Sequence, residues 1–138
     1  MTEKSCGTIP YTVKDGIVYY LLIKTKRNGN CGFPKGHVEA GENEIETAYR
    51  ETVEETSVTP DINGDFRYEM SYTLNNGNLK TVVFFPADFR DQIPKHNEGF
   101  EHYDYLILPF EEAYQRLTFA NSKIMLKKAD EYLMKTLF

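Results

Sequence analysis

The chain has 138 residues, 41% of them hydrophobic and 14% aromatic, which is enough for one domain with a single apolar core over residues 1–138. Its formal net charge of −5 argues against binding long nucleic acid, which needs a basic surface, but it leaves small anionic ligands possible. Because the sequence shows no membrane-spanning stretch, no signal-peptide pattern and only two cysteines without metal-binding spacing, we expect a cytoplasmic protein with reduced thiols at Cys6 and Cys31.

The first part of the chain is predicted to form a β-hairpin. Cys6–Val13 and Ile17–Thr25 have the apolar and β-branched composition of strands, and the Asp15-Gly16 pair between them is a turn signal. A loop rich in Gly and Asn follows at Asn28–Gly32. The two strands are therefore expected to be neighbours in one sheet.

A helix is predicted to begin near Asn43 and to end around Thr56. Apolar or small side chains at i, i+3, i+4 and i+7 define the face expected to pack on the sheet: Ile45, Ala48, Tyr49 and Thr52. The opposite, exposed side carries charged residues: Arg50, Glu51, Glu54 and Glu55.

The second half of the chain continues the mixed pattern. Two further strands, Phe66–Leu74 and Leu79–Ala87, flank an Asn- and Gly-rich turn. A strand at Tyr103–Leu108 leads into a helix at about Phe110–Arg116, and a last helix runs from about Ser122 to Leu137. The last helix has one apolar face, which indicates packing on a core: Ile124, Leu126, Ala129, Leu133 and Leu137.

The charged side of the first helix allows two interpretations. Glu51 lies at i,i+3 from Glu54 and at i,i+4 from Glu55, and like charges at these spacings cost about 0.2 to 0.5 kcal/mol each. The glutamates are either solvated surface residues or ligands of a hard divalent cation, which prefers carboxylate and carbonyl oxygens. The preceding segment, FPKGH, adds the cation of Lys35 and, at Gly36, a backbone that a ligand can approach closely.

The segment Gly36–Val58 resembles the Nudix box, G-x5-E-x7-R-E-U-x-E-E-x-G-U, in which U is a bulky aliphatic residue. Six charged or glycine positions are in register: Gly36, Glu42, Arg50, Glu51, Glu54 and Glu55. Thr52 stands at the first aliphatic position, and Ser57 replaces the last glycine, where a left-handed backbone favours Gly. The stretch FPKGHVEAGENEIETAYRET is also similar to the subfamily of asymmetrical diadenosine tetraphosphate hydrolases, which favours PKGH before the box and RET within it.

The resemblance implies an α+β protein with the Nudix fold, an α/β/α sandwich with a mixed central β-sheet. It further implies a metal-dependent pyrophosphohydrolase of nucleoside polyphosphates that cuts diadenosine tetraphosphate into ATP and AMP. Two alternatives stay open: a nucleoside triphosphate or RNA 5′-end pyrophosphohydrolase, and a nucleotide-sensing domain without turnover. Specificity lies in loops outside the box, so the fold does not separate them.

The same resemblance implies roles for individual residues. Mg²⁺ or Mn²⁺ is expected on the carbonyl of Gly36 and on a set of carboxylates: Glu51, Glu54, Glu55 and a loop residue, with Glu98 slightly preferred over Glu101. The catalytic set is Glu54, Glu51, Arg50 and His37, in which Arg50 orients a glutamate and either glutamate can be the base. Contacts to a small nucleotide substrate are expected from Lys35, Lys80, Phe84 and Phe119. The residue types alone favour a solvated Lys80 and a core Phe84, and they leave a structural and a functional His37 equally open.

Overall fold

The computed structural model describes residues 2–138, and it begins with the predicted hairpin. The strands are β1 (Thr2–Lys14) and β2 (Ile17–Thr25), paired antiparallel. Asp15 and Gly16 between them have positive φ angles of 53° and 76°. A two-residue turn with both central residues at positive φ matches the right-handed twist of the strands, so this turn sets their register.

The other elements follow in chain order: β3 (Cys31–Gly32), β4 (Lys35–His37), α1 (Glu44–Thr56), β5 (Asp61–Ile62), β6 (Tyr68–Thr73), β7 (Leu79–Asp88), β8 (Tyr103–Pro109), α2 (Phe110–Arg116) and α3 (Ala120–Leu137). Every predicted strand and helix is confirmed within a few residues. The short strands β3, β4 and β5 were not predicted, because two or three residues are too few to show a periodic pattern.

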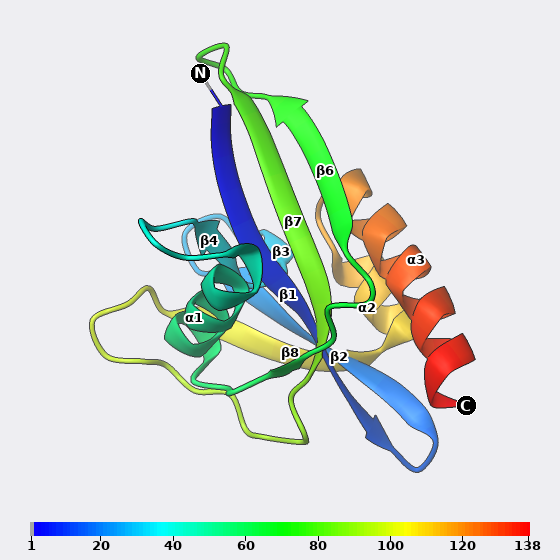
Figure 1. Cartoon of the computed structure of the whole chain (residues 1–138). Helices are drawn as coiled ribbons and strands as arrows, with labels where there is room; N and C mark the ends of the chain where they lie inside the picture. Colours follow the sequence, from blue (N-terminus) through cyan, green and yellow to red (C-terminus); the bar gives the residue numbers. More distant parts are fainter. Residues whose placement is uncertain (1) are drawn as a thin grey trace.

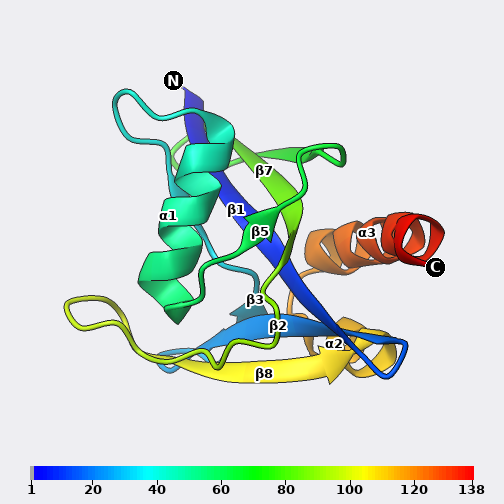
Figure 2. The ribbon, with the colours of Figure 1, turned by 60° about the horizontal axis from the view of Figure 1, so that its bottom comes forward.

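Strand β1 is the hub of a mixed sheet. Along one edge it pairs with β7 in parallel. The other edge is shared, because residues 5–7 pair with β4 and residues 11–14 pair with β2. Strand β2 pairs with β1 only up to Tyr20, and beyond that point β3 pairs with Ile23 and Lys24 on the same edge. Strand β8 pairs along the other edge of β2, from Tyr19 to Thr25. The β2–β8 part of the sheet therefore diverges from the β1–β7 part, as Figure 2 shows.

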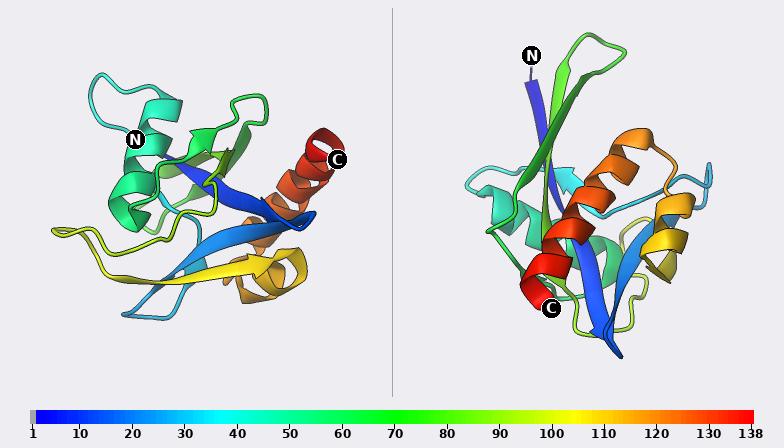
Figure 3. Two further views of the ribbon diagram at one scale, coloured as in Figure 1. Left: turned by 90° about the horizontal axis from the view of Figure 1, so that it is seen from below. Right: turned by 90° about the vertical axis from the view of Figure 1, so that its right-hand side faces the viewer.

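Helices cover both faces of this sheet. In Figure 1, α1 lies on one side of β1 and β7, and α3 lies on the other with α2 beside it. The two views of Figure 3 show the same arrangement, with the β6–β7 hairpin projecting past the helices. The larger core cluster includes buried residues of α3 and of the sheet, whereas smaller clusters include Ala48 of α1 and Val58 just after it. Within residues 2–138, no helix is long and apolar enough to cross a membrane.

The buried face of α1 differs from the predicted one. Ala48 and Thr52 are buried as expected, but Ile45 and Tyr49 are exposed. The buried stripe consists of small residues: Thr47, Ala48, Thr52 and Thr56. Threonines suit this face because Thr52 and Thr56 donate to carbonyls four residues earlier, and the Thr52 hydroxyl also bonds the Thr8 hydroxyl of β1 at 2.7 Å. Small hydroxyl side chains thus let the helix lie close to the sheet with every buried polar group paired.

The packing face of α3 is also rotated relative to the prediction. The buried residues are Met125, Leu126, Ala129 and Leu133. Ile124 and Leu137 were expected on this face but are exposed. An 18-residue helix with apolar side chains around much of its circumference leaves its rotation open, and contact with the core decides it.

Both ends of α1 have caps. At the start, Asn43 accepts a hydrogen bond from the Glu46 amide at 2.8 Å, while the Glu46 side chain accepts one from the Asn43 amide at 2.9 Å. At the end, Ser57 adopts a left-handed backbone with φ of 62°. A residue with a β-carbon is strained there, as the sequence suggested.

Replacing Ser57 by Gly is predicted to raise the free energy of unfolding by about 0.5 to 1 kcal/mol, since Gly removes the left-handed strain at a modest entropic cost. Denaturant melts measure the change. Ser57→Ala is the matched control, because it keeps a β-carbon and should bring no gain. Equal stability of the Gly and Ala variants would contradict the prediction.

Candidate active site

Arg50 lies at the centre of a network of carboxylates on α1. Its Nε and Nη2 donate to the two oxygens of Glu42 at 2.6 and 3.1 Å. Its Nη1 donates to Glu51 at 2.7 Å and to Glu54 at 2.9 Å, and Nη2 also reaches the carbonyl of His37 at 2.9 Å. The side chain is only 23% exposed. One guanidinium therefore neutralises several glutamates and joins the segment before the helix to the helix itself.

Glu42 anchors the loop that enters α1. Besides the two bonds from Arg50, it accepts from the Glu39 amide at 3.0 Å and from the Thr47 hydroxyl at 2.8 Å. Arg50 and these further donors hold the pKa of Glu42 at about 2. Glu42 is thus ionised and has its acceptor positions occupied.

The carboxyl groups of Glu51 and Glu55 lie close together, and that of Glu51 lies against Gly36 of β4. A β-carbon on Gly36 would overlap the Glu51 carboxyl group, so only glycine fits at this position. The Glu55 carboxyl lies close to that of Glu51, and burial, followed by this neighbour, raises the pKa of Glu55 far above its ordinary value. The expectation of exposed glutamates is therefore wrong for this side of the helix: Glu51 and Glu55 are partly buried.

The donor chemistry of this corner fits a hard divalent cation. Two carboxyl groups and a glycine backbone come together, and the repulsion between the ionised carboxylates is the kind that a bound cation relieves. Among residues 2–138, no three His, Cys, Asp or Glu side chains are already grouped as a metal shell. Glu54 and one oxygen of Glu51 are instead turned to Arg50.

A cavity of about 600 Å³ opens next to Glu55. Aromatic and apolar side chains from distant segments line it: Phe33, Met70, Tyr72, Val82, Phe84, Tyr103 and Phe119. Arg27 and Lys35 add positive charge, and Glu101 is a second acid beside Glu55. Phe84 lies in the wall, being 5% exposed and edge-on to Phe33, whereas Phe119 is 56% exposed. A flat apolar ligand with an anionic part matches this lining.

Lys80 and His37 lie in a separate group on β1, β4 and β7, and neither lines the cavity. Lys80 is only 7% exposed, unlike a solvated lysine at a strand end. Its Nζ donates to the Ser5 hydroxyl at 2.6 Å and lies 3.1 Å from Nε2 of His37, which is 3.4 Å from Glu3. Burial, together with the nearby charge of Lys35, lowers the pKa of Lys80.

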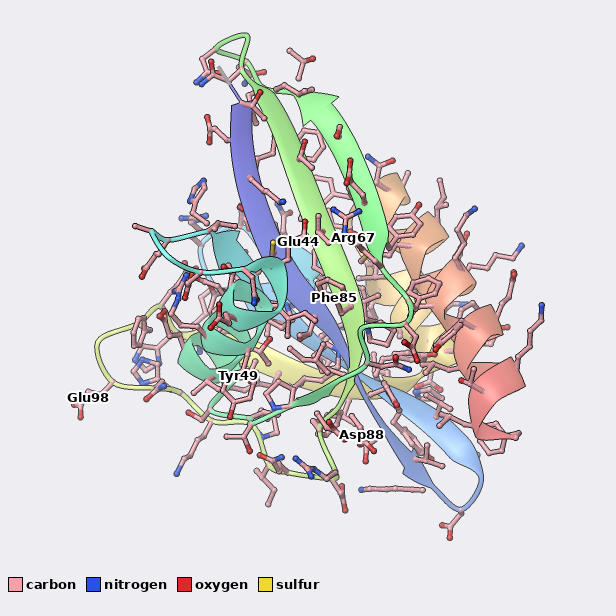
Figure 4. All side chains as sticks on the ribbon, in the orientation of Figure 1. Glu44, Tyr49, Arg67, Phe85, Asp88 and Glu98 are labelled. Atoms are coloured by element: carbon pink, nitrogen blue, oxygen red, sulfur yellow. The ribbon has the colours of Figure 1, made fainter. Side chains whose placement is uncertain are left out.

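The two loop glutamates have different surroundings. Glu98 is exposed, and Figure 4 shows it at the outer side of the 89–102 loop, pointing away from the helices. Glu101 lines the cavity with Glu55 and accepts a hydrogen bond from Tyr103 at 3.4 Å. The structure thus brings Glu101, and not the preferred Glu98, toward the glutamates of α1. The position of Gly99, which has φ of 91°, lets the chain turn between them.

Several cavity residues were not picked out in the sequence. Tyr72 lies two residues after Met70 on β6, opposite Lys80 of β7, and the alternation of side chains on a strand could have placed it beside Met70. No sequence signal was available for Arg27 or Tyr103, because their placement depends on how β2 and β8 pair.

The comparisons with known proteins agree with this geometry. The NUDIX domain family matches residues 5–128. The chain is 38% identical to a Mus musculus protein named bis(5′-nucleosyl)-tetraphosphatase (asymmetrical), in an alignment that spans 146 positions with gaps and covers 99% of each chain. A Sus scrofa protein of the same name is 31% identical over 144 residues, covering 96% of this chain and 97% of the relative. The solved binary complex of a C. elegans Ap4A hydrolase superposes with a TM-score of 0.86 at 26% identity, over 96% of this chain and 98% of that one. The predicted sandwich fold is confirmed.

The Glu42–Arg50 contact makes the free energy of unfolding depend on pH in the acidic range. Because the pKa of Glu42 falls from 4.5 to about 2 on folding, its contribution is present above pH 4.5 and is lost as the pH drops toward 2. Glu42→Gln should therefore flatten the dependence of the unfolding free energy on pH in this window. Denaturant melts of both proteins across the window, with chelator present, measure it, and parallel curves would contradict the assignment.

Proposed function

We infer the function from the family of the chain, which belongs to the Nudix family by its match to the NUDIX domain and by its relatives. It is a hydrolase of phosphoanhydride bonds in nucleoside polyphosphates, and it requires a divalent metal. We propose that its substrate is a dinucleoside tetraphosphate, foremost diadenosine tetraphosphate, cut asymmetrically into ATP and AMP. The nearly full-length relatives with the asymmetrical tetraphosphatase name support this substrate.

The observation that carries the proposal is that Glu55 lines the same cavity as the aromatic residues. A nucleobase among Phe119, Tyr72 and the apolar wall leaves the phosphates of the same molecule to run toward the glutamates of α1. The cavity is large enough for one nucleoside and has cations at Arg27 and Lys35 to meet an anionic chain.

The proposed metal is Mg²⁺ or Mn²⁺. The residues that would hold it are Glu51, Glu54, Glu55 and the carbonyl of Gly36, with Glu101 in place of Glu98 as the additional carboxylate. When bound, the cation makes water more acidic and offsets charge on the phosphate oxygens. Two of these residues, Glu51 and Glu54, also accept hydrogen bonds from Nη1 of Arg50.

The protein residues then have distinct tasks. Arg50 stays protonated and orients Glu51 and Glu54 through its hydrogen bonds, so that one of them can take the proton of the attacking water. Lys35, at the cavity, contacts the phosphate chain. Lys80 adds a buried ammonium whose hydrogen-bond partners are a hydroxyl and an imidazole, which leaves it free to attract a phosphate. For His37, which contacts Lys80 at 3.1 Å, we propose that it donates a proton to the leaving oxygen.

The proposed adenine site combines stacking with an apolar wall. Phe119 is exposed at the cavity and has a free ring face, while Phe84 forms the wall with Phe33. Stacking of a base on an aromatic side chain contributes about 1 to 3 kcal/mol. Tyr72 from β6 is a second aromatic ring for the same base.

A substrate panel separates the proposal from its alternatives. Purified protein with a divalent metal is incubated with diadenosine tetraphosphate, nucleoside triphosphates and 5′-triphosphorylated RNA, and the products are resolved by chromatography. Highest kcat/KM on the dinucleotide, with ATP and AMP as products, is expected. Preference for a triphosphate or for RNA would select the general pyrophosphohydrolase, and binding without turnover would select the sensing domain.

Two broader proposals accompany this function. We propose that residues 1–138 act as a single domain, since the helices on both faces pack on one sheet. We also propose that the enzyme is cytoplasmic, which agrees with two buried cysteines that form no disulfide within residues 2–138.

Glu55→Gln should reduce kcat by about a hundredfold or more, since outer-shell changes at metal sites already cost about tenfold to a hundredfold. Without metal the variant should be as stable as the parent or more stable, because burial and Glu51 disfavour an ionised Glu55. The rise in melting temperature with Mg²⁺ should shrink, since binding to the folded state alone stabilises it. Glu111→Gln, on α2, is the control, and full activity of Glu55→Gln would refute the ligand assignment.

Phe119→Ala is predicted to raise KM for the dinucleotide about fivefold to a hundredfold, the range that corresponds to loss of one stacking contact. Its melting temperature should change little, because the ring is 56% exposed. Phe84→Ala is the contrast: its 5% exposed ring belongs to the core, and truncation should lower stability by about 3 to 5 kcal/mol. A destabilised Phe119→Ala with unchanged KM would withdraw the stacking role.

A further inference from the structure

Tyr103 is the first residue of β8 and lines the cavity together with Glu55 and Glu101. It lies opposite Thr25 of β2, which also lines the cavity. The ring is partly buried, and its hydroxyl donates to the Glu101 carboxylate at 3.4 Å. The hydroxyl group therefore contacts one of the two acidic residues that line the cavity, Glu55 and Glu101.

The segment that carries Glu101 is held at both ends. On its N-terminal side, the Lys95 amide donates to the carbonyl of Thr56 at 2.9 Å, and the Asn97 side chain donates to the carbonyl of Val53 at 3.1 Å. On its C-terminal side, β8 begins at Tyr103. The backbone near Glu101 is thus bounded by fixed points, but a long glutamate side chain keeps several rotamers unless a partner selects one.

Tyr105, two residues further along β8, contacts the end of α1. Its hydroxyl donates to the backbone carbonyl of Glu55 at 2.9 Å. Side chains two residues apart on a strand point to the same face, so Tyr103 and Tyr105 both face the end of α1. Tyr105 thereby ties β8 to the helix backbone, and Tyr103 directs its hydroxyl to the one carboxylate that comes from outside the helix.

We propose that Tyr103 is a positioning residue for the hydrolysis, whose hydroxyl selects the orientation of Glu101 in which its carboxylate faces Glu55. The inference rests on the proposed function, and it gives the exposed side chain of Glu101 a defined orientation through the hydroxyl of Tyr103. Tyr103 does not contact the reacting atoms. It acts through Glu101, so the effect of a Tyr103 substitution on kcat must disappear when Glu101 has lost its carboxylate.

The test is a double-mutant cycle between Tyr103→Phe and Glu101→Gln in the full-length protein, assayed with diadenosine tetraphosphate over a range of Mg²⁺ concentrations. Tyr103→Phe alone should lower kcat about threefold to tenfold, the range of one modest hydrogen bond, and raise the Mg²⁺ concentration for half-maximal rate. KM for the nucleotide should stay unchanged. In the Glu101→Gln background, adding Tyr103→Phe should have no further effect.

Tyr132→Phe is the matched control, since its hydroxyl accepts a bond from Asn63 at 3.1 Å, neither residue lines the cavity, and the change should not alter kcat. Thermal melts of each variant detect a folding defect. An undiminished effect of Tyr103→Phe in the Glu101→Gln background, or a rise in nucleotide KM alone, would overturn the inference. Inactivity of the unmutated protein on every dinucleotide would instead reject the proposed function.

Discussion

The site depends on the guanidinium of Arg50. Three glutamates and one backbone carbonyl point to it, and no other residue type has enough donors in a fixed plane to bind them together. Without this cation, the spacing of Glu51, Glu54 and Glu55 along α1 would place like charges next to each other with little to offset their repulsion. Arg50 thus lets the helix carry a concentrated acidic stripe in the absence of metal. It also joins the stripe to the loop through Glu42.

A second constraint comes from the close approach of backbones around β1. A β-carbon on Gly7 would overlap the carbonyl of Pro34, and one on Gly36 would overlap the carboxyl of Glu51. Glycine at both positions lets β4 lie between β1 and α1. Since β4 and β2 share one edge of β1, the sheet must open beyond Tyr20, and the cavity lies beside this opening. The same division of the β1 edge therefore seats β4 against β1 and leaves room for the cavity.

Local features of the fold could be predicted from sequence because local physics decides them. The Asp15-Gly16 turn and the start of α1 near Asn43 need only neighbouring residues, and both are present as expected. Buried faces were less predictable. The pattern of Ile45 and Tyr49 favoured the wrong side of α1, because hydroxyls of Thr52 and Thr56 become buried once they bond the helix backbone. Hydrophobic periodicity does not register a threonine that satisfies itself in this way.

The sequence by itself determined the acidic stripe, because a helix places residues three and four apart on one side whatever surrounds it. It also determined the left-handed backbone of Ser57 at the end of α1 and the resemblance of Gly36–Val58 to the Nudix box. Only the tertiary structure decided that Glu55 is partly buried against Glu51 and that Glu101 lines the cavity while Glu98 points outward. The burial of Lys80 is of the same kind, since its partner Ser5 is 75 residues away along the chain. These properties come from contacts between distant segments, which β1, β7 and β8 bring together only when the sheet forms.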